Sequence, residues 1–140
     1  MDGWFWVRIG AVVGFLAVGM GAFGAHSLSN RLKALGTLAN YETAAQYQMY
    51  HALALVAVGG LAIAGRTGTA VAVAGWGFLL GTLVFSGSLY ILSLTGIRWL
   101  GAITPIGGVA LLVGWLALAV AAEGPSKPRI DRDFGAETSK

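Results

Sequence analysis

The sequence contains no cysteine, only three prolines, and few charged residues for a length of 140. The missing cysteines exclude disulfides, thiolate metal sites and catalytic thiols. Charged residues make up 11% of the chain, whereas a soluble domain carries about 25%. Apolar residues make up 56%. This composition predicts a membrane protein, and the length favours a single domain.

Carboxylates are scarce, which limits the available catalytic chemistry. Glu42 is the only acidic residue between Asp2 and Glu123, so that range excludes paired-carboxylate hydrolysis. Ser86 in "FSGSL" lacks the GxSxG pattern of a nucleophile elbow. The nine Lys and Arg residues are scattered or lie near the C-terminus, and they form no basic patch for nucleic acid. We expect neither an enzyme, nor a nucleic-acid-binding protein, nor a bound cofactor.

Four apolar stretches approach the length of about 20 residues that a helix needs to cross a bilayer. They cover about residues 9–25, 44–64, 69–94 and 101–122. The first follows Arg8 and runs into "AFGAHS", which faintly resembles a signal-peptide cleavage site, but Asp2 weakens the positive region that such a peptide needs. We therefore expect the first stretch to remain as a membrane span.

A short amphipathic segment lies between the first two stretches. Leu28, Leu32 and Leu35 recur there at helical spacing beside polar residues, which is typical of a helix in the membrane interface. The predicted fold is an all-α membrane protein. It is a four-transmembrane-helix antiparallel bundle with this interfacial helix between helices 1 and 2. We expect residues 1–122 to form the transmembrane domain and residues 123–140 to form a disordered polar tail.

Small residues recur along the apolar stretches at spacings that suit close helix packing. Those in the first stretch are 4, 3, 4 and 3 residues apart. In lipid, small residues let two helix backbones approach. The alternative, a glycine groove that faces a ligand, stays open. The predicted packing positions are Gly10, Gly14, Ala17, Gly21, Gly24, Gly77, Gly81, Ala110 and Gly114.

Four spans place both termini on one side of the membrane. That side carries Arg8, Arg66 and the cations of the tail, whereas the other side carries Arg31, Lys33 and Arg98. Because Lys and Arg favour the cytoplasmic face, we expect both the N- and C-termini to be cytoplasmic.

Most of the polar residues within the predicted spans fall at the end of the bundle opposite the termini. At 100° per residue, one half of the second span carries Glu42, Thr43, Gln46, Tyr47, Tyr50 and His51, and Gln48 lies off that stripe. Polar side chains inside a membrane usually face the bundle, so we expect the stripe to face inward. The whole candidate polar cluster is His26, Glu42, Gln46, Tyr47, Gln48, Tyr50, His51, Ser86, Ser88, Tyr90, Arg98 and Thr104.

Three function classes are compatible with this cluster. It favours a structural or interaction module of the membrane, with the polar residues joining the helices. The first alternative is a small transporter, channel or lipid-binding protein that uses the polar half as a vestibule. The second is a metal or haem carrier built on His26, His51 and Glu42. No HxxxH or HExxH spacing supports that carrier, so no metal site is predicted.

Four motifs connect the chain to a known family. They are "GAFGAHSL" (residues 21–28), "YQMYHALAL" (47–55), "FSGSLYIL" (85–92) and "GAITPIGG" (101–108), followed by Gly114 and Trp115. Together they resemble the domain of unknown function 423 family, which includes bacterial inner-membrane proteins and a eukaryotic relative called transmembrane protein 256. The resemblance covers about residues 9–122. It implies a multi-pass protein of the cell (inner) membrane but no activity, substrate or catalytic residue. The expected partners are the lipid bilayer and a second copy or another membrane protein.

Overall fold

Helices account for nearly all of residues 2–123, which are the residues that the computed structural model describes. The elements are α1 (Gly3–Ala25), α2 (Ser29–Leu35), α3 (Leu38–Ile63), α4 (Thr69–Thr95), the 3-10 helix η1 (Arg98–Ala102) and α5 (Thr104–Glu123). The predicted all-α class is confirmed, since this part of the chain contains no strand. The tail predicted for residues 123–140 lies outside the described residues, apart from Glu123 at the end of α5.

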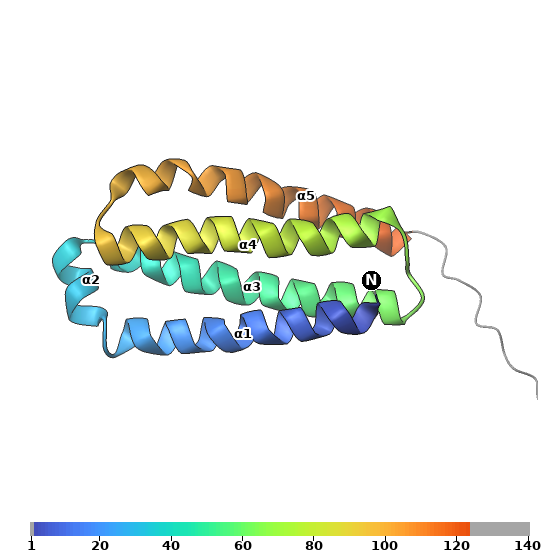
Figure 1. The fold of residues 1–140 in the computed structure, drawn as a ribbon, viewed down its shortest axis with the longest axis horizontal. Coiled ribbons are helices and arrows are strands. Elements are labelled where there is room, and N and C mark those ends of the chain that lie inside the picture. The colour runs from blue at the N-terminus through green and yellow to red at the C-terminus, as the bar shows by residue number, and fades with distance from the viewer. Residues whose placement is uncertain (1, 124–140) are drawn as a thin grey trace, which may run out of the picture.

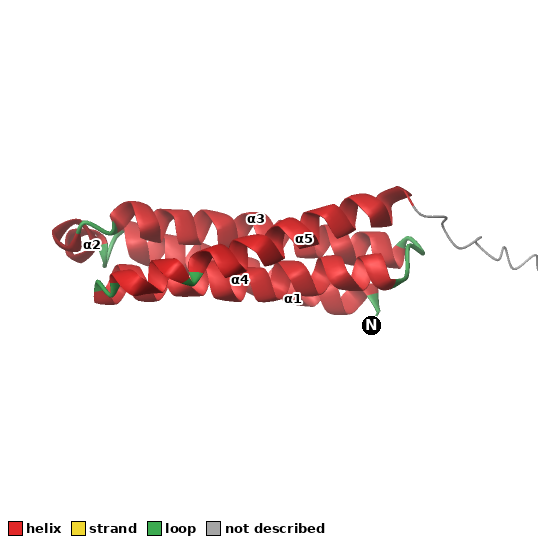
Figure 2. Cartoon of the chain, turned by 90° about the horizontal axis from the view of Figure 1, so that it is seen from above, coloured by secondary structure: helices red, strands yellow, loops and turns green. Residues whose placement is uncertain are grey.

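The four long helices lie lengthwise beside one another. Figure 1 shows α1, α3, α4 and α5 in this arrangement, with α2 across one end of the molecule. In the second view the N-terminus lies at the end opposite α2 (Figure 2). We call these the α2 end and the N-terminal end. The end of α1, the start of α3, the end of α4 and the start of α5 all lie at the α2 end.

Three segments are long and apolar enough to cross a membrane. They are α1, α4 and Arg98–Glu123, which joins η1 to α5. The fourth long helix, α3, has 26 residues but is not one of the three, because the first half of α3 carries Gln46, Gln48 and His51.

Two helices begin earlier than the apolar pattern predicts. α1 begins at Gly3 because the Asp2 carboxylate accepts a hydrogen bond from Phe5 N at 3.0 Å and so caps the helix. α3 begins at Leu38 and includes Asn40, Glu42 and Thr43 in its first two turns. Hydropathy detects the part of a helix that meets lipid, and a helix that continues into the interface extends past that signal.

α1 and α3 approach closely through small residues. A Cβ added at Gly3 would lie 2.5 Å from the Gly59 carbonyl oxygen, and one at Gly10 would lie 2.8 Å from the Ala52 carbonyl oxygen. Ala17 is also buried. A Cβ at Gly24 would collide with the ring of Tyr41. Glycine is therefore required at these contacts because backbone or ring atoms of α3 occupy the space.

α4 and α5 are joined in the same way. A Cβ added at Gly77 would lie 2.9 Å from the Gly114 Cα, and one at Gly81 would lie 2.6 Å from Leu111 Cδ2. A Cβ at Gly107 would collide with the backbone of Phe85. This pair of helices is thus a second hairpin built on close backbone approach.

The contact between the two hairpins holds the largest buried side chains. α3 packs against α4, and the core cluster includes Trp6, Leu55, Val58, Phe78 and Leu111. The indole ring of Trp6 reaches from α1 to α4 and fills the space above Gly75, where a Cβ would collide with it.

α2 closes one end of the molecule. Leu32 is fully buried, and Arg31 Nη2 donates a hydrogen bond to the Leu94 carbonyl at 3.0 Å. Just after α2, Thr37 Oγ1 donates to the Ser93 carbonyl at 2.8 Å. The α1–α3 connection is therefore fastened to the last turn of α4.

Candidate functional site

Gln48 joins three helices from the middle of the molecule. Its amide Nε2 donates to the Val13 carbonyl of α1 at 3.0 Å, and its Oε1 accepts from the Tyr90 hydroxyl of α4 at 2.9 Å. Both functions of the buried amide are thereby satisfied. We call Gln48, Tyr90 and the Val13 carbonyl the Gln48 network.

Tyr41 extends this network toward the α2 end. The Tyr41 hydroxyl donates to the Met20 carbonyl of α1 at 2.8 Å. Its ring meets the ring of Tyr90 edge-on, with centroids 5.0 Å apart. The two tyrosines therefore tie α3 to α1 and to α4 while their rings fill the space between these helices.

His51 connects α3 to α5. Its Nδ1 lies 2.7 Å from the Tyr47 carbonyl oxygen, and its Nε2 accepts from Trp115 Nε1 at 3.2 Å. A carbonyl only accepts and an indole N–H only donates, so Nδ1 carries the proton and Nε2 carries none. These two bonds therefore fit only a neutral imidazole whose proton is on Nδ1.

Two hydroxyls join α4 to α5 nearer the α2 end. Ser88 Oγ lies 2.9 Å from Thr104 Oγ1 and donates to the Phe85 carbonyl at 3.0 Å. By contrast, Ser86 Oγ and Thr82 Oγ1 are buried without a hydrogen-bond partner among the described residues. Both line a cavity of about 150 Å³ that Gln48 and Tyr90 also line.

Six members of the predicted cluster lie at the surface. They are His26, which is the C-cap of α1, and Glu42, Gln46, Tyr47, Tyr50 and Arg98. The structure differs here from the predicted inward stripe. The reason is the packing face of α3, whose buried positions are Tyr41, Ala44, Gln48, His51, Ala52, Ala54, Leu55, Val58 and Gly59. Spacings of three and four residues place Gln48 on this face and Glu42 and Gln46 off it.

Not all of the predicted helix-packing positions lie at a contact between helices. Gly10, Gly24, Gly77, Gly81 and Gly114 meet a neighbouring helix closely, and Gly14 makes an ordinary contact with Ala52. Ala17 is buried, and the Ala110 carbonyl faces Gly77. Gly21, however, has open space where a Cβ would stand. Gly21 therefore lies off the α1–α3 contact.

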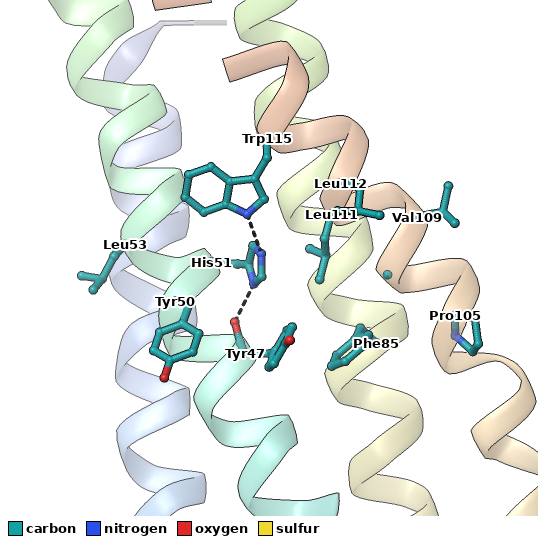
Figure 3. Close-up of a pocket in the computed structure, with 11 residues that line it drawn as sticks. Tyr47, Tyr50, His51, Leu53, Phe85, Pro105, Val109, Leu111, Leu112 and Trp115 are labelled. Carbon is teal, nitrogen blue, oxygen red and sulfur yellow. Dashed lines mark hydrogen bonds between the residues drawn. The ribbon is translucent and has the colours of Figure 1, made fainter. Parts of the chain in front are cut away.

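An elongated groove lies between α3 and α5 at the α2 end. The backbones of these two helices stay apart along most of their length. Its volume is about 800 Å³. α3 contributes Tyr47, Tyr50, His51 and Leu53, α4 contributes Phe85, and α5 contributes six residues between Pro105 and Trp115. Figure 3 shows α3 and α5 on either side, with Phe85 between them and the His51–Trp115 pair at the end away from Pro105. We call this the α3–α5 groove.

Aromatic side chains line much of the groove. The rings of Tyr47 and Phe85 stack with centroids 4.6 Å apart, and Trp115 meets Phe78 edge-on at 5.0 Å. Tyr50 is 56% exposed and Tyr47 is 39% exposed. Unlike the hydroxyls of Tyr41 and Tyr90, theirs have no partner within residues 2–123. The lining contains no charged residue.

The geometry gives no support to a metal or haem carrier. No group of three His, Asp or Glu side chains gathers among residues 2–123. Both ring nitrogens of His51 are already engaged, one with Tyr47 and one with Trp115. His26 and Glu42 face outward at the α2 end.

Sequence reasoning missed several residues that contribute to these contacts. The predicted cluster does not include Thr37, Tyr41, Thr82 or Trp115. Trp115 lies eleven residues after Thr104, about three helical turns, which puts both on one side of α5. That spacing was the available signal for Trp115.

The fold and the site define a class before any comparison is made. Residues 2–123 are almost entirely helical and include three helical segments suited to crossing a membrane, and the buried Gln48 is bonded to two neighbouring helices. The chain belongs to the family described as "Protein of unknown function (DUF423)", which matches residues 20–108. The family resemblance of the four motifs is thereby confirmed.

Relatives in this family are named as membrane proteins. The UPF0382 membrane protein SSP2132 of Staphylococcus saprophyticus is 53% identical over 81% of this chain and 92% of its own length. The UPF0382 membrane protein YwdK of Bacillus subtilis is 48% identical over 83% of this chain and 94% of its own length. No solved structure matches the chain.

Proposed function

We propose that this protein is an integral membrane interaction module that binds its partner or ligand in the α3–α5 groove. All four long helices cross the bilayer as an antiparallel bundle, and α2 lies in the interface. The protein resides in the cell membrane with both termini in the cytoplasm. The observation that carries the proposal is the groove itself, which the packing of the other helices leaves open.

We include α3 as a fourth span because its buried polar groups are hydrogen-bonded inside the bundle. Gln48 and His51 are 8% and 4% exposed, and their polar atoms bond to α1, α4 and α5 or to α3 itself. Polar groups bonded inside a bundle do not meet lipid, so their cost in the bilayer is largely removed. The exposed residues in the second half of α3 are apolar or glycine.

The Gln48 network and the groove have separate roles in this proposal. The Gln48 network holds α1, α3 and α4 in one arrangement, because Gln48 is bonded to Val13 and to Tyr90. The groove is lined by the exposed side chains of Tyr47 and Tyr50 and is open to the surroundings. Binding therefore belongs to the groove, and stability belongs to the network.

A filled groove tests the proposal. A Cβ at Gly108 would contact only the Phe85 ring at 3.9 Å, and Gly60 on α3 has open space. Gly108→Phe therefore fills the groove, and Gly60→Phe is its matched control. A detergent-solubilised extract of bacterial membranes supplies both lipids and membrane proteins.

We expect this extract to raise the Tm of the wild type and of Gly60→Phe but not of Gly108→Phe. A ligand at 100 times its Kd stabilises a folded protein by about 2.7 kcal/mol. Equal shifts for all three proteins, or no shift for the wild type, contradict the proposal.

The absence of native cysteine allows a direct test of the topology. Ser27→Cys lies between α1 and α2, and Thr67→Cys lies in the α3–α4 loop; both positions are exposed. With cytoplasmic termini, an impermeant thiol reagent labels Ser27→Cys from outside intact cells and leaves Thr67→Cys unlabelled. The reverse pattern means that the orientation is inverted, and labelling of both overturns the four-span topology.

A further inference from the structure

We infer that the occupant of the α3–α5 groove is one acyl chain of a phospholipid from the leaflet at the α2 end. This inference rests on the proposed function, because it names what the same groove binds.

The depth of the groove matches one leaflet. On α5 its lining runs from Pro105, in the first turn, to Trp115, near the middle of the helix. Ten residues of helix rise about 15 Å, and the hydrocarbon core of a bilayer is about 30 Å thick. His51 lies near the midpoint of α3. The groove therefore extends from the α2-side interface to the middle of the bundle.

The His51–Trp115 pair lies at the inner end of the groove. There the indole of Trp115 reaches from α5 to His51 on α3 (Figure 3). At the outer end, Pro105 and the exposed Tyr47 side chain lie nearer the interface. An acyl chain that enters beside Pro105 thus ends with its terminal methyl group against the His51–Trp115 pair.

The chemistry of the lining selects a hydrocarbon chain over a polar headgroup. No Asp, Glu, Lys or Arg lines the groove, and the hydrogen-bonding atoms of His51 are already engaged. A charged group at this depth would have no counter-charge among the lining residues. The headgroup therefore stays outside, and the site distinguishes lipids by chain length.

The length of the groove favours a chain over a helix from a second copy or another protein. A helix that crosses the hydrocarbon core must extend over about 30 Å, whereas the groove runs for only about 15 Å along α5. A single acyl chain lies within one leaflet and fits between α3 and α5 beside Gly108.

Native mass spectrometry of purified protein tests the occupant with defined lipids. The protein is mixed in detergent with dipalmitoyl phosphatidylcholine, dipalmitoyl phosphatidylglycerol or dioctanoyl phosphatidylcholine. We expect one dipalmitoyl lipid to stay bound after the detergent is removed, with less than a twofold difference between the two headgroups. Retention of the dioctanoyl lipid is expected to be at least fivefold lower.

Variants connect the bound lipid to the groove. Gly108→Phe lowers lipid retention at least fivefold, and Gly60→Phe leaves it unchanged. Thermal unfolding of each variant shows whether it is folded. If Gly108→Phe does not fold, Val109→Trp fills the groove instead. Its control is Leu116→Trp, an exposed position on α5 outside the lining. Equal lipid retention by the groove variant and its control overturns the inference.

Other results separate this inference from the proposed function. Suppose that the membrane extract raises the Tm of the wild type but not of Gly108→Phe, and that purified phospholipid is not retained. The acyl-chain occupant is then wrong, and the proposal that the groove binds a partner or ligand stands. A disulfide between two Val109→Cys chains in the membrane, without lipid retention, assigns the groove to a second copy and also overturns the inference. If neither extract nor phospholipid acts through Gly108, both proposals fail.

Discussion

The indole N–H of Trp115 donates a hydrogen bond to Nε2 of His51 across 3.2 Å, and this pair joins α5 to α3. The Nδ1–H of the same imidazole is held by the Tyr47 carbonyl at 2.7 Å. Because one partner only accepts and the other only donates, the histidine has a single compatible protonation form.

The tautomer of His51 is the first testable consequence. ¹⁵N NMR of labelled protein in detergent is expected to show a protonated Nδ1 and an unprotonated Nε2. Trp115→Phe keeps a ring against Phe78 but removes the indole N–H that donates to Nε2, so the Nε2 resonance shifts while Nδ1 stays bonded to Tyr47. His26, an exposed helix cap, is the internal control. A protonated Nε2 in the wild type would contradict the hydrogen bond to Trp115.

Gln48 and Gln46 form a matched pair for stability, since one is buried and the other exposed on the same helix. Gln48→Leu removes the bonds to Val13 and Tyr90 and leaves the Tyr90 hydroxyl without its acceptor. A buried unsatisfied group costs about 1–3 kcal/mol. We expect a lower Tm for Gln48→Leu and an unchanged or higher Tm for Gln46→Leu. The opposite ranking would show that Gln48 is not the interior glutamine.

Tyr90→Phe tests the same network with a smaller change. It removes only the hydroxyl that donates to Gln48 and keeps the edge-on contact with Tyr41. Interhelical hydrogen bonds in membrane proteins contribute about 0.6 kcal/mol on average. A double-mutant cycle with Gln48→Leu is expected to be non-additive, because both changes break one bond. Strict additivity of the unfolding free energies rules out the direct contact.

Two glycines of α1 are expected to respond to alanine in opposite ways. A Cβ at Gly10 would lie 2.8 Å from the Ala52 carbonyl oxygen, whereas Gly21 has open space. Gly10→Ala therefore forces α1 and α3 apart and costs about 1–3 kcal/mol, as overpacking does. Gly21→Ala gains up to about 1 kcal/mol from helix propensity. Thermal unfolding of the two variants side by side measures the difference, and equal Tm values contradict the packing described here.

The apolar runs of the sequence predicted the long helices well. The residues of a helix that contact lipid are apolar, so the length of an apolar run reflects the length of the helix. Glycine spacing likewise indicated the contacts at Gly10, Gly77 and Gly81. The helix ends were predicted less accurately, since the Asp2 cap and the polar residues in the first two turns of α3 give no hydropathy signal.

The site was harder to predict than the helices. On a helical wheel the polar residues of the second span form a stripe, which was expected to face inward, and Gln48 lies off that stripe. In the structure the interior face of α3 follows Tyr41, Ala44, Ala52 and Leu55, and Gln48 shares their spacing. The groove was beyond sequence reasoning, because it depends on how far apart α3 and α5 lie after both have packed on α4.

Each long helix packs mainly on its neighbour in the chain: α1 on α3, α3 on α4, and α4 on α5. During synthesis, α1 therefore meets its partner as soon as α3 emerges, without waiting for the rest of the chain. The glycine contacts let the α1–α3 and α4–α5 hairpins form as separate units. Such local pairing requires little loop closure and favours rapid assembly. The contacts of Tyr90 with Gln48 and of Trp6 with Gly75 then join the two hairpins to each other.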